Sequence, residues 1–162
     1  MGSLREAPDL ILIGEIRTRE TMEAAIELSG TGHLAISTLH ANNAHQAMER
    51  IINMFPQELH KTLFMDLSLN LRAIISQRLV RTVEGKRAAA VEILVNTPHI
   101  SDLIRDGRTD EIKDAMASST EGGMVTFDDA LLALYREERI GLEKCLANAD
   151  SAANLEAKIN FG

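Results

Sequence analysis

The feature that most constrains the fold is a pair of short apolar runs that flank an amphipathic segment near the start of the chain. LILIG occupies residues 10–14, HLAISTLH occupies residues 33–40, and RETMEAAIELSG lies between them at residues 19–30. Continuous apolar runs of this length are typical of strands covered on both faces. We therefore expect two fully buried strands joined by a helix and, if the strands are neighbours, a parallel sheet.

Local signals support the helix between the two runs. Thr18 can cap its first turn, and Gly30 and Gly32 are placed to end it. Further along the chain, apolar spacing predicts a helix over residues 44–55 and a long helix from Pro56 to Leu79. A hairpin is expected next, with strands at 79–83 and 88–95 and a turn at 84–86.

The chain after Pro98 reads as a series of short helices. Their expected ranges are 98–106, 109–118, 126–138, 141–149 and 151–159. The sequence thus has an α/β part over residues 1–95 and a helical part over residues 96–162.

Composition narrows the function classes. The 162 residues suffice for one ordinary domain or two small units, and 3% aromatic content requires an aliphatic core. A net charge of −7 argues against nucleic-acid binding as the main activity. The single cysteine, Cys145, excludes an internal disulfide and a Cys-rich zinc site, which fits a cytoplasmic protein. No apolar stretch is long enough to span a membrane.

Polar residues follow both apolar runs at the point where each strand should end. Gly14-Glu15-Ile16-Arg17 follows the first run, and Thr38 and His40 close the second. Ligands bind at the carboxyl ends of strands in open parallel sheets, so Glu15, Thr38 and His40 are expected to converge. A carboxylate there can hold Mg²⁺ through water or polarise an attacking water. A hydroxyl and an imidazole can sense a terminal phosphate.

One part of a phosphoryl-transfer site is missing from the sequence. No G-x-x-x-x-G-K-[ST] segment, whose backbone N–H groups would cradle phosphates, occurs in the 162 residues. The one Gly-Lys pair, Gly85-Lys86, is followed by Arg87 and belongs to the expected hairpin turn.

These motifs carry a family resemblance. LREAPDLILIGEIRTRETMEAAIELSGTGHLAISTLHANNAHQAMERIINMFP is similar to the Walker B and His-box region of the type II/IV secretion ATPases. Within that family it most resembles the type IV pilus retraction ATPases, the PilT and PilU group. The likeness continues through MDLSLNLRAIISQRLV, VEILVNTPHISDLIRDGRTDEI and GGMVTFDDALLALYREERI, nearly to the end of the chain.

The resemblance implies an α/β fold that is part of a RecA-like P-loop NTPase core. This part would lack the N-terminal strands and phosphate loop and be followed by a small helical subdomain. It would divide into residues 1–95, with Walker B and His box, and residues 96–162, the helical subdomain. The implied catalytic residues are Glu15, which would hold Mg²⁺ through water, and His40. The implied nucleotide-binding residues are Gly14, Arg17, His33 and Thr38, with ATP and Mg²⁺ as cofactors of the full-length parent.

The same resemblance implies partners and a cellular place. The parent would be a homo-hexamer that drives twitching motility, acting at the inner membrane from the cytoplasmic side through the pilus machinery and its platform protein. A contact with the paralogous retraction ATPase is a further implication. The phosphate loop and Asp box would lie upstream of residue 1, so we expect the isolated chain to be inactive.

Other readings stay open at this point. The chain could be a non-catalytic oligomerisation or interaction module, or part of an assembly or secretion ATPase of the GspE and PilB kind. Arg17 could pair with Glu15 or Glu20 instead of acting in catalysis. Several residues have a structural reading: Arg72 and Arg78 as solvated or interface charges, Asp128 and Asp129 as first-turn helix residues, Cys145 as core, and His33, His45, His60 and His99 as residues without a metal-ligand pattern.

Overall fold

The computed structural model describes residues 9–119 and 122–162 and divides the chain into two compact units. The first unit runs through residue 41 and includes 45–72 and 96–112, whereas the second contains 42–44, 73–95 and 113–162. Each unit is therefore assembled from segments that alternate along the chain. The division near residue 95 stays a prediction.

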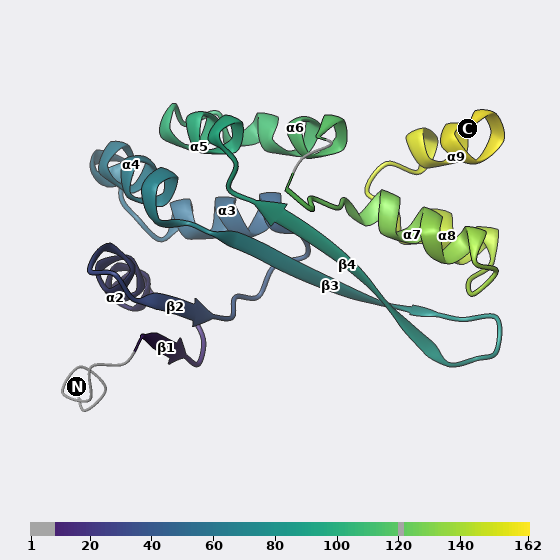
Figure 1. Cartoon of the computed structure of the whole chain (residues 1–162), viewed down its shortest axis with the longest axis horizontal. Helices are drawn as coiled ribbons and strands as arrows, with labels where there is room; N and C mark the ends of the chain where they lie inside the picture. The colour runs from purple at the N-terminus through teal and green to yellow at the C-terminus, as the bar shows by residue number, and fades with distance from the viewer. Residues whose placement is uncertain (1–8, 120–121) are drawn as a thin grey trace. The chain divides into compact units, whose positions relative to one another are not determined.

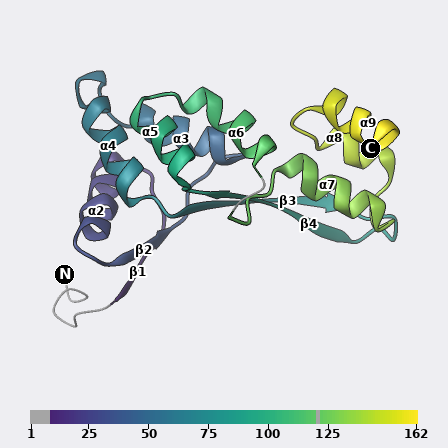
Figure 2. The same ribbon diagram turned by 45° about the horizontal axis from the view of Figure 1, so that its top comes forward.

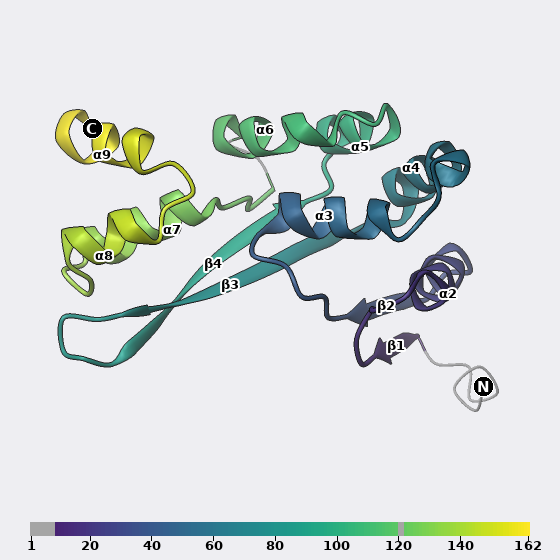
Figure 3. The same cartoon turned by 180° about the vertical axis from the view of Figure 1, so that it is seen from behind.

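The first unit is built around the β-α-β element that the sequence predicted. Strands β1 (Leu10–Ile13) and β2 (Leu34–Ser37) pair in parallel, with Leu10 opposite Leu34 and Ile13 opposite Ser37. Helix α2 (Arg19–Gly30) connects them, and the three elements lie together in views from opposite sides (Figures 1 and 3). The parallel pairing places the carboxyl ends of both strands at one edge of the sheet.

Helix α2 has the boundaries that its capping residues predict. The Thr18 side chain accepts a hydrogen bond from the Thr21 backbone N–H, which satisfies a first-turn donor. Met22 and Ala25 are buried on the inner face of the helix. Just beyond the helix, Gly32 adopts a φ of +90°, a left-handed conformation that glycine takes without steric cost.

The expectation that both strands are fully buried is wrong. Ile11 is buried, but Leu12 is 73% exposed, and Leu10, Leu34 and Ile36 are also exposed. Strand residues alternate between faces, and the register places these four exposed side chains on one face. Within the described residues, α2 covers one face of the sheet while the opposite face remains open.

The remaining elements of the first unit are helical. They are α3 (Ala44–Asn53, from its second residue on), η1 (Gln57–Leu59), α4 (His60–Asn70), α5 (Pro98–Arg105) and η2 (Thr109–Glu111). The backbone carbonyl of Ser68 in α4 accepts hydrogen bonds from Asn96 Nδ2 at 3.0 Å and from Ser101 Oγ at 2.8 Å. These bonds fix α5 against α4.

The predicted long helix from Pro56 to Leu79 is wrong in its second half. Helix α4 ends at Asn70, and Leu71 already has extended backbone angles of −65° and 133°. Residues 73–81 instead form a strand in which alternate side chains point inward. The apolar residues of this stretch fit both a helical period and a strand period. It forms a strand because it pairs with residues 87–95.

The second unit is an antiparallel hairpin packed against helices. Strands β3 (Ala73–Arg81) and β4 (Arg87–Val95) pair along their whole length, and Gly85 takes a φ of +79° in the turn between them. The helices are α6 (Ile112–Ser118, from Lys113 on), α7 (Phe127–Arg136), α8 (Leu142–Ala147) and α9 (Ala152–Phe161). Figure 2 shows α7, α8 and α9 on one side of the hairpin.

The core of the second unit lies between the hairpin and α7–α9. Its buried members are Val80, Ala88, Ala90, Phe127, Leu131, Leu132, Leu134, Ile140, Cys145 and Leu155. Cys145 thus occupies the core position that the sequence indicated. No helix among the described residues is both long enough and apolar enough to cross a membrane.

Candidate functional site

The carboxyl ends of β1 and β2 are joined by two hydrogen bonds. The backbone N–H of Ile16 donates to the Thr38 carbonyl at 2.9 Å, and Thr38 Oγ1 donates to the Gly14 carbonyl at 2.7 Å. These bonds extend the parallel pairing beyond the strands and hold Glu15 beside the segment that leads to His40. The sequence prediction that Glu15, Thr38 and His40 converge at one sheet edge agrees with this geometry.

The Glu15 carboxylate is the centre of the edge. Its Oε2 lies 2.7 Å from Nε of Arg17, and its Oε1 lies 2.8 Å from Nε2 of His40. The Glu15 side chain is 22% exposed, whereas those of Arg17 and His40 are 76% and 80% exposed. A mostly covered carboxylate is therefore flanked by two side chains that can reorient in solvent.

One oxygen of this carboxylate has unused hydrogen-bonding capacity. Oε1 of Glu15 is buried and accepts no hydrogen bond from the described residues. His40 Nε2 is close enough for an ion pair, but its ring N–H does not have hydrogen-bond geometry to this oxygen. Buried carboxylate oxygens normally have donors, so an unsatisfied one suits a group that arrives from outside the chain.

Gly14 and His33 differ in their relation to this edge. A side-chain carbon at Gly14 would meet no atom within 4 Å, so the described packing does not require glycine there and the space above it is open. His33 precedes β2, at the opposite end of a strand about 13 Å long. Its Nδ1 contacts Thr31 Oγ1 and the Leu28 carbonyl, so the structure does not bring His33 to Glu15.

Sequence reasoning missed a second carboxylate, Glu92, in the middle of β4. Its side chain is 5% exposed, and its oxygens accept hydrogen bonds from the backbone N–H groups of Ala44 and Phe127. Burial raises the pKa of Glu92; the two N–H donors and Arg78 oppose the rise, and Asp150 adds to it. The available signal is a charged residue inside the apolar run AAAVEILV, just as Glu15 is a charged residue at the end of the run LILIG.

Arg78 also departs from expectation. It lies on β3 and not on a helix, and its guanidinium bonds Asp150 Oδ1 at 2.7 Å with the side chain only 20% exposed. The reading of Arg78 as a solvated charge is therefore wrong. Asp128, a first-turn residue of α7, accepts hydrogen bonds from the backbone N–H groups of Asp150 and Ser151.

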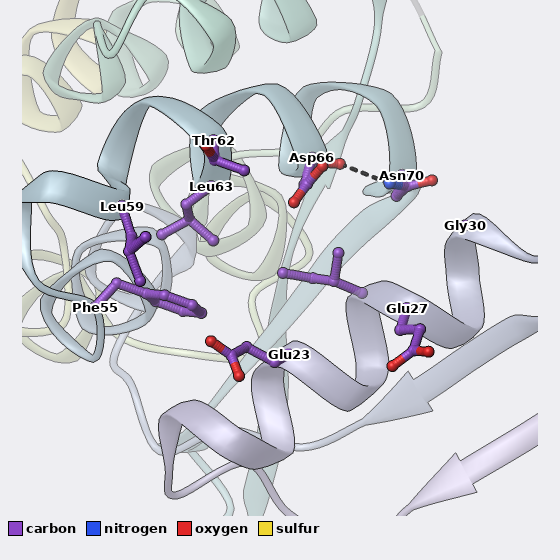
Figure 4. Close-up of a pocket in the computed structure, with 10 residues that line it drawn as sticks. Glu23, Glu27, Gly30, Phe55, Leu59, Thr62, Leu63, Asp66 and Asn70 are labelled. Atoms are coloured by element: carbon purple, nitrogen blue, oxygen red, sulfur yellow. Dashed lines mark hydrogen bonds between the residues drawn. The ribbon is translucent and has the colours of Figure 1, made fainter.

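A separate hollow of about 410 Å³ lies between α2 and α4 in the first unit (Figure 4). Its lining includes the apolar Phe55, Leu59 and Leu63 and the carboxylates of Glu23, Glu27 and Asp66. The hollow contains none of the three residues that converge at the sheet edge. We therefore place the candidate site at Glu15 and not in this hollow.

Comparison with known proteins agrees with the motifs at the Glu15 edge. Residues 2–122 match the family model described as type II/IV secretion system protein. The chain is 55% identical over 162 residues to the type IV pilus ATPase PilU of Pseudomonas aeruginosa. The match covers 99% of this chain and 42% of that protein. It is 36% identical over 153 residues to the type IV pilus retractation ATPase PilT of the same organism, covering 94% and 44%.

A solved structure shows the same fold. The pilus retraction motor PilT with bound ADP matches the chain with a TM-score of 0.84 at 35% identity, covering 96% of this chain and 43% of that one. The expected α/β architecture is thereby confirmed as part of such a motor's fold. The chain spans less than half the length of these relatives.

Proposed function

Because the chain belongs to the type II/IV secretion system protein family, we propose that it forms one wall of the nucleotide site of a type IV pilus retraction ATPase. The observation that carries the proposal is the Glu15 carboxylate, held at the shared end of two parallel strands with Thr38 and His40 beside it. The PilU and PilT relatives and the ADP-bound motor support this choice of enzyme class.

The residues at this edge fit a magnesium ion held through water. Hard cations prefer oxygen ligands, and Oε1 of Glu15 is a carboxylate oxygen without a donor among the described residues. Glu15 would hold the ion through one of its water ligands. When bound, Mg²⁺ supplies positive charge that offsets the charge of the nucleotide phosphates.

Glu15 acts in this proposal as the general base. The oxygen of a water bonds to the terminal phosphorus of ATP while the bond from that phosphorus to the oxygen of the departing ADP breaks. The water's proton passes to Oε1. Arg17 holds Oε2 at 2.7 Å and thereby orients the carboxylate. His40 is 80% exposed, so its ring can swing from Oε1 toward the terminal phosphate without disturbing the packing.

Thr38 has a positioning role at this site. Its hydroxyl donates to the Gly14 carbonyl and so fixes the backbone that carries Glu15. The oxygen keeps a lone pair that can accept a further hydrogen bond. Gly14, Arg17 and Thr38 thus contribute to nucleotide binding from the strand ends, and we extend the same role to His33 on the family resemblance alone.

The longer protein that carries this chain would complete the site and the motor. Phosphate binding needs a cradle of N–H groups and a lysine, and the 162 residues contain no such loop. The longer protein would assemble as a hexamer and couple ATP hydrolysis to pilus retraction. It would work in the cytoplasm at the inner membrane with the platform protein and a paralogous retraction ATPase.

A non-catalytic interaction module is the second candidate, because four large apolar side chains are exposed on the open face of β1 and β2. Calorimetric titration with Mg-ATP separates the two candidates. We expect no micromolar binding to the 162-residue chain and restored binding in a version extended upstream through a phosphate loop. Absence of binding in the extended version would favour the interaction module.

A further inference from the structure

Glu92 links the beginnings of two helices through one buried side chain. Its Oε1 accepts the backbone N–H of Ala44 at 2.9 Å, and its Oε2 accepts that of Phe127 at 3.3 Å. Ala44 is the first residue of α3, and Phe127 is the first residue of α7. N–H groups at helix starts lack partners within the helix, so the carboxylate satisfies both starts at once.

Arg78 makes a second set of contacts on the same face of the hairpin. Besides Asp150, its guanidinium donates to the carbonyls of Asn148 at 2.8 Å and Asn42 at 3.3 Å. It also lies over the Phe127 ring, 4.0 Å from the centroid, where the aromatic face attracts a cation. Arg78 therefore holds the start of α7, the turn before α9 and the backbone at Asn42 together.

The two sets of contacts meet on a short segment, residues 42–44, that begins two residues after His40. Arg78 bonds the carbonyl of Asn42, and Glu92 bonds the N–H of Ala44. The segment 42–44 belongs to the second unit, although the residues on both sides of it belong to the first. Only Ala41 separates it from His40.

A buried carboxylate is a costly way to cap a helix. Thr18 and Thr97 cap other helices of this chain with local hydroxyls. Glu92 reaches Ala44 from 48 residues away, and α7 already has its own cap in Thr126. Since a nearby hydroxyl can cap a helix in this chain, stability alone does not explain the long-range Glu92 carboxylate. The backbone segment that it holds in place explains it better.

We propose that Glu92 and Arg78 are positioning residues for His40, because they anchor the backbone at 42–44, which follows the histidine along the chain. The consequence for ATP hydrolysis rests on the proposed function, but the positioning of His40 does not.

The test uses the 162-residue chain and needs no nucleotide. Glu92→Gln keeps the size of the side chain but leaves a single acceptor oxygen. Glu84→Gln, at an exposed position in the hairpin turn, is the matched control. In a folded Glu92→Gln variant we expect amide exchange at Ala44 or Phe127 to rise about tenfold. We also expect the His40 imidazole resonances to shift at constant pH, with neither change in the control.

Unchanged His40 resonances in a folded Glu92→Gln variant would overturn the proposal. If that variant does not fold, Arg78→Lys provides the test, because it keeps the charge but loses the planar guanidinium, whose Nη1 bonds Asn148 and whose Nη2 bonds Asn42 and Asp150. We expect the same His40 resonances to move in Arg78→Lys, and their constancy would be equally contradictory.

A second readout connects the positioning to catalysis. In the longer protein with its phosphate loop, we expect Glu92→Gln to lower kcat about tenfold with little change in KM. Glu84→Gln should keep the original rate. A failure of the proposed function would appear as full activity of a Glu15 variant, whereas a failure of this inference would appear as an unmoved His40.

Discussion

Glu15 and Glu92 both interrupt apolar runs of the sequence, but their surroundings differ. Glu15 lies at a strand end, and its two partners are the exposed side chains of Arg17 and His40. Glu92 lies in the middle of β4, and its partners are two backbone N–H groups that cannot move without moving a helix. The first environment allows a proton or ligand to be exchanged, and the second favours holding a structure in place.

The difference teaches that a buried acid is informative only together with the mobility of its partners. An acid paired with exposed side chains can reorganise at low cost during chemistry. An acid bonded to buried backbone N–H groups leaves unsatisfied donors when it is removed. Substitutions that compare the two sites should therefore give opposite balances of stability and function.

The largest difference in stability is expected on removing the carboxylates. Glu92→Ala leaves two buried N–H groups without acceptors, so the free energy of unfolding should fall by about 2–5 kcal/mol. Glu15→Ala should change it by less than about 1 kcal/mol, since its partners are exposed. Urea denaturation followed by circular dichroism measures both, and equal losses would remove the distinction.

The pH dependence of stability is expected to separate the two sites next. The folded protein raises the pKa of Glu92 above 4.5, so the folded state binds this proton more tightly than the unfolded chain does. The stabilising contribution is complete below pH 4.5 and is lost as the pH rises through the raised pKa. As the pH rises through this pKa, the free energy of unfolding should therefore fall less in Glu92→Gln than in the unsubstituted protein. Denaturation at a series of pH values measures this difference.

A smaller effect is expected from the hydroxyl that joins the two strand ends. Thr38→Val removes the hydrogen bond to the Gly14 carbonyl and should cost about 1 kcal/mol of unfolding free energy. Thr38→Ser keeps the hydroxyl and should retain most of the stability. If both substitutions cost the same, the bond does not hold Glu15 in place.

The smallest effect is expected at Arg17. Its ion pair with Glu15 is exposed, so Arg17→Ala should cost about 0.5 kcal/mol or less, and this cost should shrink at high salt. Arg105→Ala is a control, because Arg105 forms an exposed pair with Asp102 at 3.0 Å. The two variants should be equally stable, and a large loss in Arg17→Ala alone would assign Arg17 a structural role.

Local signals predicted the β-α-β unit and the approach of Glu15, Thr38 and His40. The Thr18 cap and the strand ends depend on residues close in sequence, and parallel pairing then fixes the shared edge. From Leu71 to Leu79 the spacing of the apolar residues predicts a helix, because it fits the helical period. The stretch forms a strand because pairing with β4 satisfies its backbone hydrogen bonds. The sequence of one segment does not reveal such a partner.

Other parts of the site were beyond reach because they depend on distant segments. The partners of Glu92 are 48 and 35 residues away, and no local pattern connects them. The exposure of Leu12 was also unpredictable. A continuous apolar run indicates that both faces of a strand are to be buried, but it does not indicate which segment covers each face. The family resemblance implies a nucleotide-binding role for His33, but His33 precedes β2, at the other end of that strand from Thr38 and His40.

The most direct test of the central claim is single-turnover ATP hydrolysis by the longer protein, comparing Glu15→Gln with the unsubstituted form. If Glu15 is the general base, the variant should hydrolyse bound Mg-ATP at least about 100-fold more slowly in a single turnover. Hydrolysis within about twofold of the unsubstituted rate would contradict the assignment of this sheet edge as the catalytic wall.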